Sequence, residues 1–401
     1  MRNVVVVGAS LAGLRAAETL RQDGYDGRLV LIGAEDHLPY DRPPLSKQLL
    51  AGKVDAEQVS LCAADRVEDL GFDWHLGRRA TALDLDARQV VVDDVDRIDF
   101  DGLVIATGAS PRQLPGVPPL DGIHLLRTLD DCLAIRAGLE KVVSSSGHVV
   151  VVGAGFIGSE VAATCRTAGA QVTVLEALAT PLSKALGEQM GAACAALHYD
   201  NGVDLRTGAG VSGFHGPHRV EGVVLRDGTT MEADLVVVGV GVAPNTEWLE
   251  SSGLRLDNGV VCDSTGHAAP GVVAAGDVAR WHNPLFETDM RLEHWTNAAE
   301  GGIAAARALL AGPEKAEPYA PVPYFWSDQY KTKIQFVGHV HHGDDVRVVD
   351  GSVQDRKFLA LYEHAGRVVG ALGFSRPKLV LQCRRLIADR VSLDEALGQL
   401  T

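Results

Sequence analysis

Residues 4–13 read Val-Val-Val-Val-Gly-Ala-Ser-Leu-Ala-Gly, and residues 149–158, which start 145 positions further along, read Val-Val-Val-Val-Gly-Ala-Gly-Phe-Ile-Gly. Each stretch predicts a buried parallel strand, a tight glycine turn and the start of a helix. In such a turn the first glycine bends the chain and the third lets the helix pack closely, so that backbone amides face a pyrophosphate. The repeated motif therefore predicts two dinucleotide-binding sites.

The residues that follow each motif strengthen this interpretation. The first motif continues through a predicted helix at 14–21 into a strand at 29–35 that ends in Glu35, and the second continues through a predicted helix at 159–167 into a strand at 172–176 that ends in Glu176. A carboxylate at this place accepts hydrogen bonds from a ribose hydroxyl. Ser10 replaces the middle glycine in the first motif only, so we interpret the two sites as binding different dinucleotides.

Length and charge limit the class of protein. A chain of 401 residues predicts two or three domains, because single cores rarely grow beyond roughly 300 residues. The net charge of −15 disfavours nucleic acid and anionic membranes as partners. The first strand begins at Val4, and no apolar run reaches the ~20 residues of a membrane-spanning helix. We therefore expect a cytoplasmic protein.

The domain organisation follows from further apolar strands and proline-containing segments. Residues 102–108 and 235–241 are predicted to complete the two motif units, and residues 271–277 look like a later strand of the first sheet, which makes the first domain discontinuous. Boundary signals include Pro111, Pro115, Pro118 and Pro119, and later Pro313, Pro318, Pro321 and Pro323. We predict domains at 1–112 with 245–320, at 113–244 and at 321–401, the last being α+β.

The motifs together resemble a known family, the FAD- and NADH-dependent ferredoxin reductases of bacterial oxygenase systems, which includes putidaredoxin, rubredoxin and biphenyl-dioxygenase reductases. The resemblance covers essentially the whole chain. It rests on residues 8–13 with Glu35, 41–47, 106–112, 153–158 with Glu160, 276–277, 293–295 and 325–330. It implies an α/β fold with two Rossmann-like domains, as in glutathione reductase, the first binding FAD and the second NADH.

The resemblance also implies roles for individual residues. Arg42, Pro43 and Lys47 would lie beside the flavin, and Asp277 would hold its ribityl chain. The full set of implied cofactor-binding residues is Gly8, Ser10, Ala12, Gly13, Glu35, Arg42, Pro43, Lys47, Ala106, Thr107, Gly108, Arg112, Gly153, Gly155, Phe156, Ile157, Gly158, Glu160, Glu176, Gly241, Gly276, Asp277, Glu293, His294, Trp295 and Trp326. Lys47 and Glu160 are the implied catalytic pair.

Several of these roles have plain structural alternatives. Lys47 suits either a charge near a reduced flavin or a solvated side chain after Pro43-Pro44. Glu160 suits either a group that orients the nicotinamide or an acid in the first turn of a helix, where the dipole favours it. Trp295 and Trp326 suit either the border of the flavin or an ordinary hydrophobic core. The residues alone leave these alternatives open.

The second site favours NADH over NADPH, because Glu176 would repel a 2′-phosphate and residues 177–179 supply no guanidinium.

The six cysteines show no paired spacing, so we expect neither a disulfide framework nor a redox-active dithiol, and we expect the thiols to be reduced and mostly buried. Residues 339–342 contain three histidines, but adjacent strand positions face opposite ways, so we predict a surface loop and no metal site.

We therefore interpret the chain as an enzyme that passes electrons from NADH through FAD to a two-iron two-sulfur ferredoxin serving a haem monooxygenase or ring dioxygenase. Residues 321–401 hold 11 Lys and Arg against 9 Asp and Glu, which suits an acidic ferredoxin docking beside the flavin entrance. The candidate basic residues are Lys331, Lys333, Arg376, Lys378, Arg384 and Arg385. Alternatives are a rubredoxin or small-molecule reductase, and an NADH-responsive binding protein similar to apoptosis-inducing factor.

Overall fold

A computed structural model describes residues 1–62, 70–117, 119–341 and 343–400. Pro118 and His342, named above, lie outside the described residues. The chain forms two compact units. Unit 1 comprises Met1–Asp41, Val59–Ser110 and Ala243–Tyr324, and unit 2 comprises Arg42–Gln58, Pro111–Val242 and Phe325–Thr401. The division into three domains drawn from the sequence stays a prediction.

Unit 1 contains β1 (Asn3–Val7), α1 (Leu11–Gln22), β2 (Arg28–Ile32), β3 (Asp73–His75), β4 (Ala80–Asp84), β5 (Gln89–Val92), β6 (Asp96–Asp99), β7 (Gly102–Ile105), η4 (Glu247–Leu249), β18 (Val260–Cys262), β19 (His267–Ala269), β20 (Val272–Ala274), η5 (Gly276–Val278), β21 (Ala279–Asn283), β22 (Thr288–Met290) and α5 (Trp295–Ala311). The short strands β8 (Ala109–Pro111) and β17 (Val242–Pro244) lie where the chain passes from one unit to the other.

The main sheet of unit 1 has the order β19-β20-β7-β1-β2-β3. β1 runs parallel to both β2 and β7, with Val7 in register with Ile32 and Ile105. β20 pairs in parallel with β7, so the predicted return of the chain into the first sheet is confirmed. Because these strands are parallel and in register, their carboxyl ends reach one edge together.

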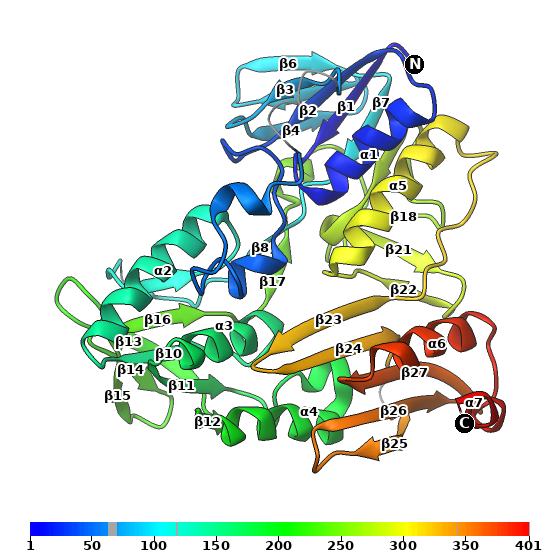
Figure 1. The fold of residues 1–401 in the computed structure, drawn as a ribbon. Coiled ribbons are helices and arrows are strands. Elements are labelled where there is room, and N and C mark those ends of the chain that lie inside the picture. The colour runs from blue at the N-terminus through cyan, green and yellow to red at the C-terminus, as the bar shows by residue number, and fades with distance from the viewer. Residues whose placement is uncertain (63–69, 118, 342, 401) are drawn as a thin grey trace. The chain divides into compact units, whose positions relative to one another are not determined.

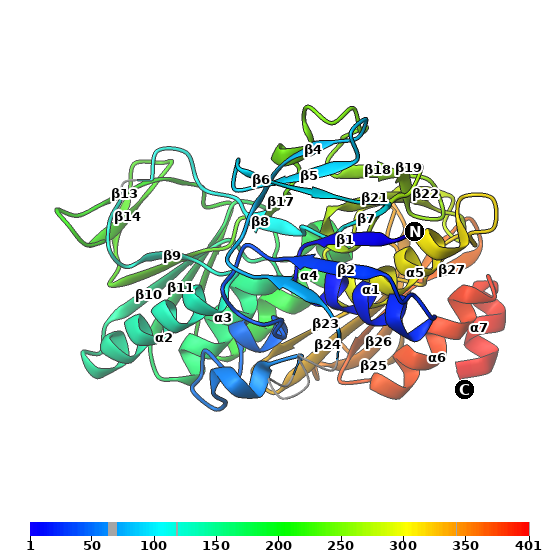
Figure 2. The ribbon, with the colours of Figure 1, turned by 90° about the horizontal axis from the view of Figure 1, so that it is seen from above.

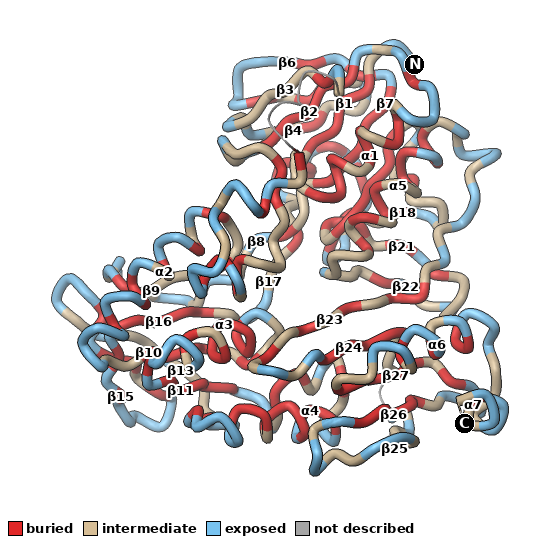
Figure 3. The backbone as a smooth tube through the Cα atoms, in the orientation of Figure 1, coloured by how far each residue is buried: buried red, intermediate tan, exposed pale blue. Residues whose placement is uncertain are grey.

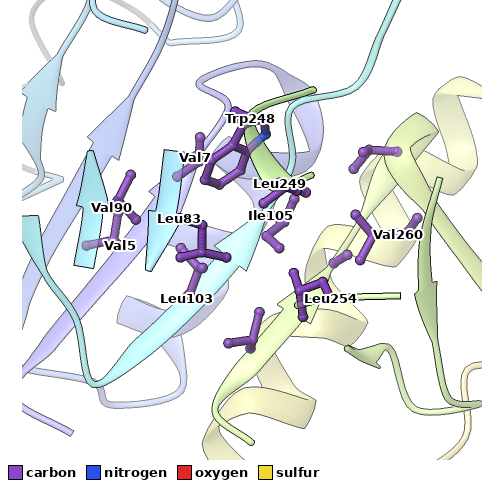
Figure 4. Packing of buried hydrophobic residues seen from close by; sticks show 14 of the residues in the cluster. Val5, Val7, Leu83, Val90, Leu103, Ile105, Trp248, Leu249, Leu254 and Val260 are labelled. Atoms are coloured by element: carbon purple, nitrogen blue, oxygen red, sulfur yellow. The ribbon is translucent and has the colours of Figure 1, made fainter. Parts of the chain in front are cut away.

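The alternation of side chains along β1 builds two cores. Val4 and Val6 pack with α1 and α5, which lie side by side over one face of the sheet (Figures 1 and 2). Val5 and Val7 point to the opposite face, where they pack with residues such as Leu103, Ile105 and Trp248 (Figure 4). A parallel sheet covered on both faces explains the unbroken run of valines in the sequence.

Unit 2 contains η1 (Pro43–Ser46), η2 (Ala56–Val59), β9 (Ile123–Leu125), α2 (Leu129–Ser144), β10 (His148–Val152), α3 (Phe156–Thr167), β11 (Gln171–Glu176), α4 (Ser183–Asp200), β12 (Asp204–Thr207), β13 (Val211–His215), β14 (Gly222–Leu225), β15 (Thr230–Glu232), β16 (Leu235–Val238), β23 (Tyr324–Gln329), β24 (Thr332–Gly338), β25 (Asp345–Ser352), β26 (Lys357–His364), β27 (Arg367–Phe374), α6 (Pro377–Ala388) and α7 (Leu393–Leu400).

Unit 2 repeats the parallel arrangement and adds an antiparallel sheet. Its first sheet has the order β12-β11-β10-β16-β9, with β10 parallel to β11 and β16. Its second sheet has the order β23-β24-β27-β26-β25 and packs against α4, and most of β24, β26 and β27 is buried (Figure 3). Phe358, Phe374 and Tyr362 are fully buried. The Tyr362 hydroxyl donates to the Leu186 carbonyl over 2.8 Å. The predicted α/β fold and the α+β C-terminal region are confirmed.

The predicted helices at 14–21 and 159–167 are parts of α1 and α3, which begin three residues earlier than predicted, at Leu11 and Phe156. The difference arises because the last glycine of each motif is itself helical. Among the described residues, no helix combines the length and apolar character that crossing a membrane requires.

The close packing of turn and helix depends on glycine. A Cβ on Gly13 would lie 1.8 Å from the Gly8 carbonyl oxygen, and a Cβ on Gly158 would lie 2.0 Å from that of Gly153. Gly8 and Gly153 also have positive φ, at +114° and +98°. The predicted roles of the first and third glycines are thereby explained by space and by backbone conformation.

We expect Gly8→Ala to destabilise unit 1 far more than Gly24→Ala does. Both glycines have positive φ, but a Cβ on Gly8 would lie 2.1 Å from the Ala106 carbonyl oxygen, whereas a Cβ on Gly24 would have no described heavy atom within 4 Å. Positive φ alone costs alanine about 1–2 kcal/mol, and the clash adds to that cost. Urea unfolding of the two variants measures the difference, and equal midpoints would contradict it.

Candidate functional site

The first candidate site lies at the carboxyl edge of the unit 1 sheet. Backbone hydrogen bonds fix the turns there: the Gly8 amide donates to the Ile32 carbonyl over 2.8 Å, and the Ala106 amide donates to that of Val7 over 2.7 Å. The Ala275 amide donates to the Ile105 carbonyl over 3.0 Å. This arrangement gathers the predicted residues of three segments at one edge, namely Gly8, Ser10, Ala12, Gly13, Ala106, Thr107, Gly108, Gly276 and Asp277.

The start of α5 belongs to the same edge. A Cβ on Gly276 would lie 3.9 Å from the Cα of Ala298 in the first turn of α5, so η5 and the helix start are neighbours. Trp295 is the first residue of α5, as predicted, and its indole Nε1 donates to the Asp41 carboxylate over 2.6 Å. Burial lowers the pKa of His294 to about 4, against the opposing effect of Asp277, so its imidazole is neutral at pH 7.

Glu35 and Trp295 differ from ordinary core residues. Glu35 lies three residues beyond β2, is half-buried and accepts a hydrogen bond from the Tyr40 hydroxyl. Trp295 is likewise half-buried, and so is Trp326, which lies on the partly exposed face of β23 in unit 2. Neither tryptophan is fully buried, and a position at the border of the flavin stays a prediction for both.

The second candidate site lies at the carboxyl edge of the parallel sheet in unit 2. The Gly153 amide donates to the Leu175 carbonyl over 2.8 Å, which places the glycine turn beside the end of β11. Glu176 is the last residue of β11, and its two carboxylate oxygens accept from the amides of Ala154 at 2.7 Å and Leu178 at 2.8 Å. The Glu176 carboxylate is thus held beside the glycine turn, and its oxygens keep lone pairs for a further hydrogen-bond donor.

Gly155 shows that this turn leaves room for a ligand. Among the described residues, no heavy atom lies within 4 Å of where its Cβ would be, so protein packing does not require glycine there. Gly155 is also the N-cap of α3 and supplies no side-chain cap, whereas α2 has a capping box formed by Thr128 and Asp131. Open space beside uncapped amides fits the pyrophosphate of a dinucleotide.

The corresponding turn of unit 1 has the same character. Ser10 is the N-cap of α1, but its hydroxyl makes no capping hydrogen bond to the described backbone. The amides at the start of α1 are therefore not satisfied by a side-chain cap and can face an anion. The residues of both units fit a dinucleotide.

Sequence reasoning missed part of the second site. Ile157, Leu178 and Val240 are large apolar side chains that remain 44%, 42% and 36% exposed. They follow β10, β11 and β16, the three strands whose carboxyl ends form the edge. Ile157 was predicted as a cofactor-binding residue, but Leu178 and Val240 were not. Leu178 could have been predicted from the sequence, because it is an apolar residue in the loop that directly follows the acid Glu176.

Lys47 and Glu160 form a buried ion pair in unit 2. The Lys47 Nζ lies 2.6 Å from the Glu160 Oε2, and the two side chains are 11% and 4% exposed. The Ser46 hydroxyl donates to the same oxygen, and the Ser327 hydroxyl donates to the Glu160 Oε1 over 2.8 Å. Lys47 is therefore paired, and the interpretation of this lysine as a solvated charge is wrong.

The expected position of Glu160 in the first turn of its helix is also wrong. Because α3 begins at Phe156, Glu160 lies past the first turn, and its carboxylate accepts from residues of η1 and β23. Helix capping therefore does not explain this acid. Ser46 and Ser327 were missed because nothing in their local sequence indicates that they meet a residue more than a hundred positions away.

The remaining predicted residues of unit 2 lie in different segments of the chain. Arg42 is the N-cap of η1 and donates to the Arg127 carbonyl, and Pro43 is the first residue of η1. Arg112 is exposed, and its Nε donates to the Val242 carbonyl over 3.0 Å. Gly241 has a positive φ of +102°.

The cysteines supply no redox pair. All six are buried, and the sequence predicted that most of them would be. Burial raises the pKa of Cys132, Cys165, Cys194, Cys262 and Cys383 to about 12. These five thiols are therefore protonated at neutral pH and unsuited to thiol–disulfide exchange.

Two family models match the chain. The model described as pyridine nucleotide-disulphide oxidoreductase matches residues 2–302, and the model described as reductase C-terminal matches residues 324–398.

Individual proteins match over nearly the full length. The putidaredoxin reductase of Pseudomonas putida is 37% identical over 98% of this chain and 94% of its own. The ferredoxin reductase component of chlorobenzene dioxygenase from Cupriavidus is 36% identical with the same coverage. Among solved structures, that of the covalent putidaredoxin reductase–putidaredoxin complex superposes with a TM-score of 0.93 and 35% identity, covering 100% of this chain and 98% of the matched chain.

We expect Glu160→Gln to slow the reduction of bound flavin by NADH by roughly tenfold or more, because a displaced positioning group lowers the fraction of productive complexes. Stopped-flow absorbance under anaerobic conditions measures this rate. The variant also leaves the Lys47 charge without its partner, so thermal unfolding is measured in parallel.

Two further variants distinguish a positioning role of Glu160 in flavin reduction from a role in the stability of the fold. The double variant Lys47→Gln/Glu160→Gln removes both charges, and Asp389→Asn breaks the exposed Arg385–Asp389 pair, whose atoms lie 3.7 Å apart. A positioning role predicts slow flavin reduction in the double variant and a normal rate in Asp389→Asn. Recovery of the rate in the double variant would instead indicate a role in stability alone.

Proposed function

Because the chain belongs to the pyridine nucleotide-disulphide oxidoreductase family, we propose that it carries electrons from NADH through FAD to a two-iron two-sulfur ferredoxin. The family and the relatives named as ferredoxin–NAD(+) reductases confirm the predicted oxidoreductase class and the predicted cofactors, FAD and NADH. The observation that carries the proposal is the combination of two dinucleotide-binding edges with cysteines that form no redox pair. Electrons then leave through the flavin itself, without a protein dithiol.

FAD binding is assigned to the edge of unit 1. The amides of the first turn would hold the pyrophosphate, Glu35 would accept from a ribose hydroxyl, and Asp277 would accept from the ribityl chain. The first turn of α5, which lies beside Gly276, belongs to the same edge. When bound, the flavin supplies the coupling of a two-electron donor to a one-electron acceptor.

NADH binding is assigned to the edge of unit 2. Glu176 would accept from the 2′-hydroxyl of the adenosine ribose, with the carboxylate already oriented by the Ala154 and Leu178 amides. The exposed side chains of Ile157, Leu178 and Val240 would cover apolar parts of the nucleotide. Glu160, held by Lys47, Ser46 and Ser327, would orient the nicotinamide.

The acceptor and the cellular setting rest on the relatives. The similar proteins are named as reductases of putidaredoxin, of rhodocoxin and of dioxygenase systems, which supports a ferredoxin that serves an oxygenase. A rubredoxin or small-molecule acceptor is the alternative that the same flavin chemistry allows. A cytoplasmic location stays our proposal, supported by the need for NADH and by six buried cysteines that show no paired spacing in the sequence.

We expect the kcat/KM for NADH to exceed that for NADPH by roughly a hundredfold, because a 2′-phosphate beside the Glu176 carboxylate adds a repulsion of a few kcal/mol. Steady-state kinetics with ferricyanide as the acceptor measures both values. Ala177→Arg should lower the ratio of kcat/KM for NADH to kcat/KM for NADPH, because it supplies a guanidinium that can pair with the 2′-phosphate. Ala195→Ser in α4, away from the edge, should leave this ratio unchanged. Equal efficiency with the two nucleotides in the unaltered protein would refute the assignment.

We also expect the double variant Lys378→Glu/Arg385→Glu to slow reduction of an acidic two-iron ferredoxin and to weaken its dependence on salt. Both residues are exposed on α6 and flank Leu381, which is 69% exposed. Lys333 and Arg376 are weaker candidates, because they pair with Asp328 at 2.8 Å and Asp350 at 2.5 Å, closer than the 3.7 Å between Arg385 and Asp389. Stopped-flow mixing of NADH-reduced enzyme with oxidised ferredoxin at several ionic strengths measures the effect.

The matched control for this experiment is Arg347→Glu, which reverses an exposed charge on β25 of the same unit. Flavin reduction by NADH should be normal in both proteins, since neither change touches the assigned cofactor residues. An unchanged rate and salt dependence in the α6 variant would remove α6 from the docking surface. A failure to reduce any two-iron ferredoxin would overturn the proposed acceptor.

A further inference from the structure

The loop between β24 and β25 brings two histidines and an aspartate together. His341 and Asp344 belong to this loop, and His364 is the last residue of β26. One ligand atom from each of the three side chains can be chosen so that all lie within 4.8 Å of one another. The prediction of no metal site here is based on neighbouring positions alone, and it leaves out the acid Asp344 and the distant His364.

The strand register explains why these residues meet. Asp345 lies opposite Glu363 in the antiparallel pair of β25 and β26. The preceding residue, Asp344, therefore lies beside the following residue, His364, and the His364 Nδ1 is 2.7 Å from the Asp344 Oδ1. His341 is brought in by the turn, in which the Asp344 amide donates to the His341 carbonyl over 3.2 Å.

The Asp344 carboxylate is the centre of the cluster. Its side chain is 0% exposed, and it also accepts from the His341 backbone amide over 2.7 Å. A carboxylate removed from water requires a counter-charge, which a neutral imidazole does not supply. The register pair of Asp345 and Glu363 adds two further acidic residues nearby. The local charge therefore favours a cation.

His341 has a nitrogen available for such a cation. Its Nδ1 is buried and has no hydrogen-bond partner among the described residues. The nearest carboxylate oxygen, Asp344 Oδ2, is 3.6 Å away. Ligand atoms bound about 2.1 Å from a tetrahedral ion lie about 3.4 Å from each other, so the two imidazole–carboxylate distances, 2.7 and 3.6 Å, bracket the separation that a bound ion needs.

The ring geometry requires one adjustment. The rings of His341 and His364 are stacked, with centroids 4.5 Å apart and planes inclined by 27°. The in-plane lone pairs of both rings converge on one ion only after one ring rotates. The His364 side chain is 51% exposed, so it has the space to turn, whereas the His341 ring is held edge-on against the ring of His339.

We propose that His341, Asp344 and His364 form a binding site for a zinc-like divalent cation, with water completing the coordination. Two imidazoles and one carboxylate with an open fourth position are a ligand set that suits Zn²⁺. The ion joins the β24–β25 loop to the end of β26, and it replaces the direct contact between the His364 Nδ1 and the Asp344 Oδ1. This site is independent of the proposed electron transfer.

The test is equilibrium dialysis of the untagged, FAD-loaded protein against Zn²⁺ after removal of metals with a chelator, with zinc and protein measured by elemental analysis. We expect one zinc ion per chain in excess of the binding shown by His341→Gln/His364→Gln. Each single variant, His341→Gln and His364→Gln, should raise the dissociation constant at least about tenfold, which corresponds to about 1.4 kcal/mol.

The matched control is His282→Gln. His282 pairs with Asp289 at 3.2 Å on an exposed strand pair, and the described residues around it supply no third metal ligand. This variant should bind zinc as the unaltered protein does. Asp344→Asn, which removes the charge and keeps much of the shape, should lose the site, and near-ultraviolet circular dichroism would show that it remains folded. Zinc binding that the double variant retains, or that His282→Gln reduces equally, would overturn the proposal.

Discussion

The contact between a helical glycine and the carbonyl of a turn glycine supports both halves of this protein. With Gly13 against the Gly8 carbonyl and Gly158 against that of Gly153, any side chain at the helical position would meet backbone at 2.0 Å or less. The contact holds the start of the helix over the end of the strand, so the first amides of the helix, which the N-cap residue does not cap with its side chain, lie at the sheet edge. The cofactor-binding assignments in each unit depend on this one approach.

The parallel sheets then decide which other residues can take part. Because β1, β7 and β20 in unit 1 are parallel and in register, residues from three distant segments must arrive at one edge. The same holds for β10, β11 and β16 in unit 2. This is why short motifs separated by long stretches of chain could be assigned to common sites from the sequence: strand direction and register convert separation along the chain into proximity.

Other features were beyond sequence reasoning, and the reasons differ. The contacts of Glu160 with Ser46 and Ser327 could not be predicted, because the motifs that contain the two serines do not indicate which residues meet across more than a hundred positions. The start of α3 was placed three residues late, because the last motif glycine was counted with the turn, and this error created the false expectation of a first-turn acid. The neighbours Asp344 and His364 follow from the register of β25 and β26, which hydrophobic alternation alone does not determine to one residue.

The burial of the Lys47–Glu160 pair is informative because it has a free-energy cost. Removing two charges from water costs several kcal/mol per ion, and a pair of apolar residues in the same space is often equally stable. The protein offsets part of this cost with hydroxyl donors from Ser46 and Ser327 on both oxygens of the acid. Stability gives little reason for such a construction. The need for a fixed orientation explains it better, since a carboxylate held from three directions keeps one position, and a group that orients a cofactor must not move. The geometry of Glu160 therefore supports positioning over packing as the reason for its burial.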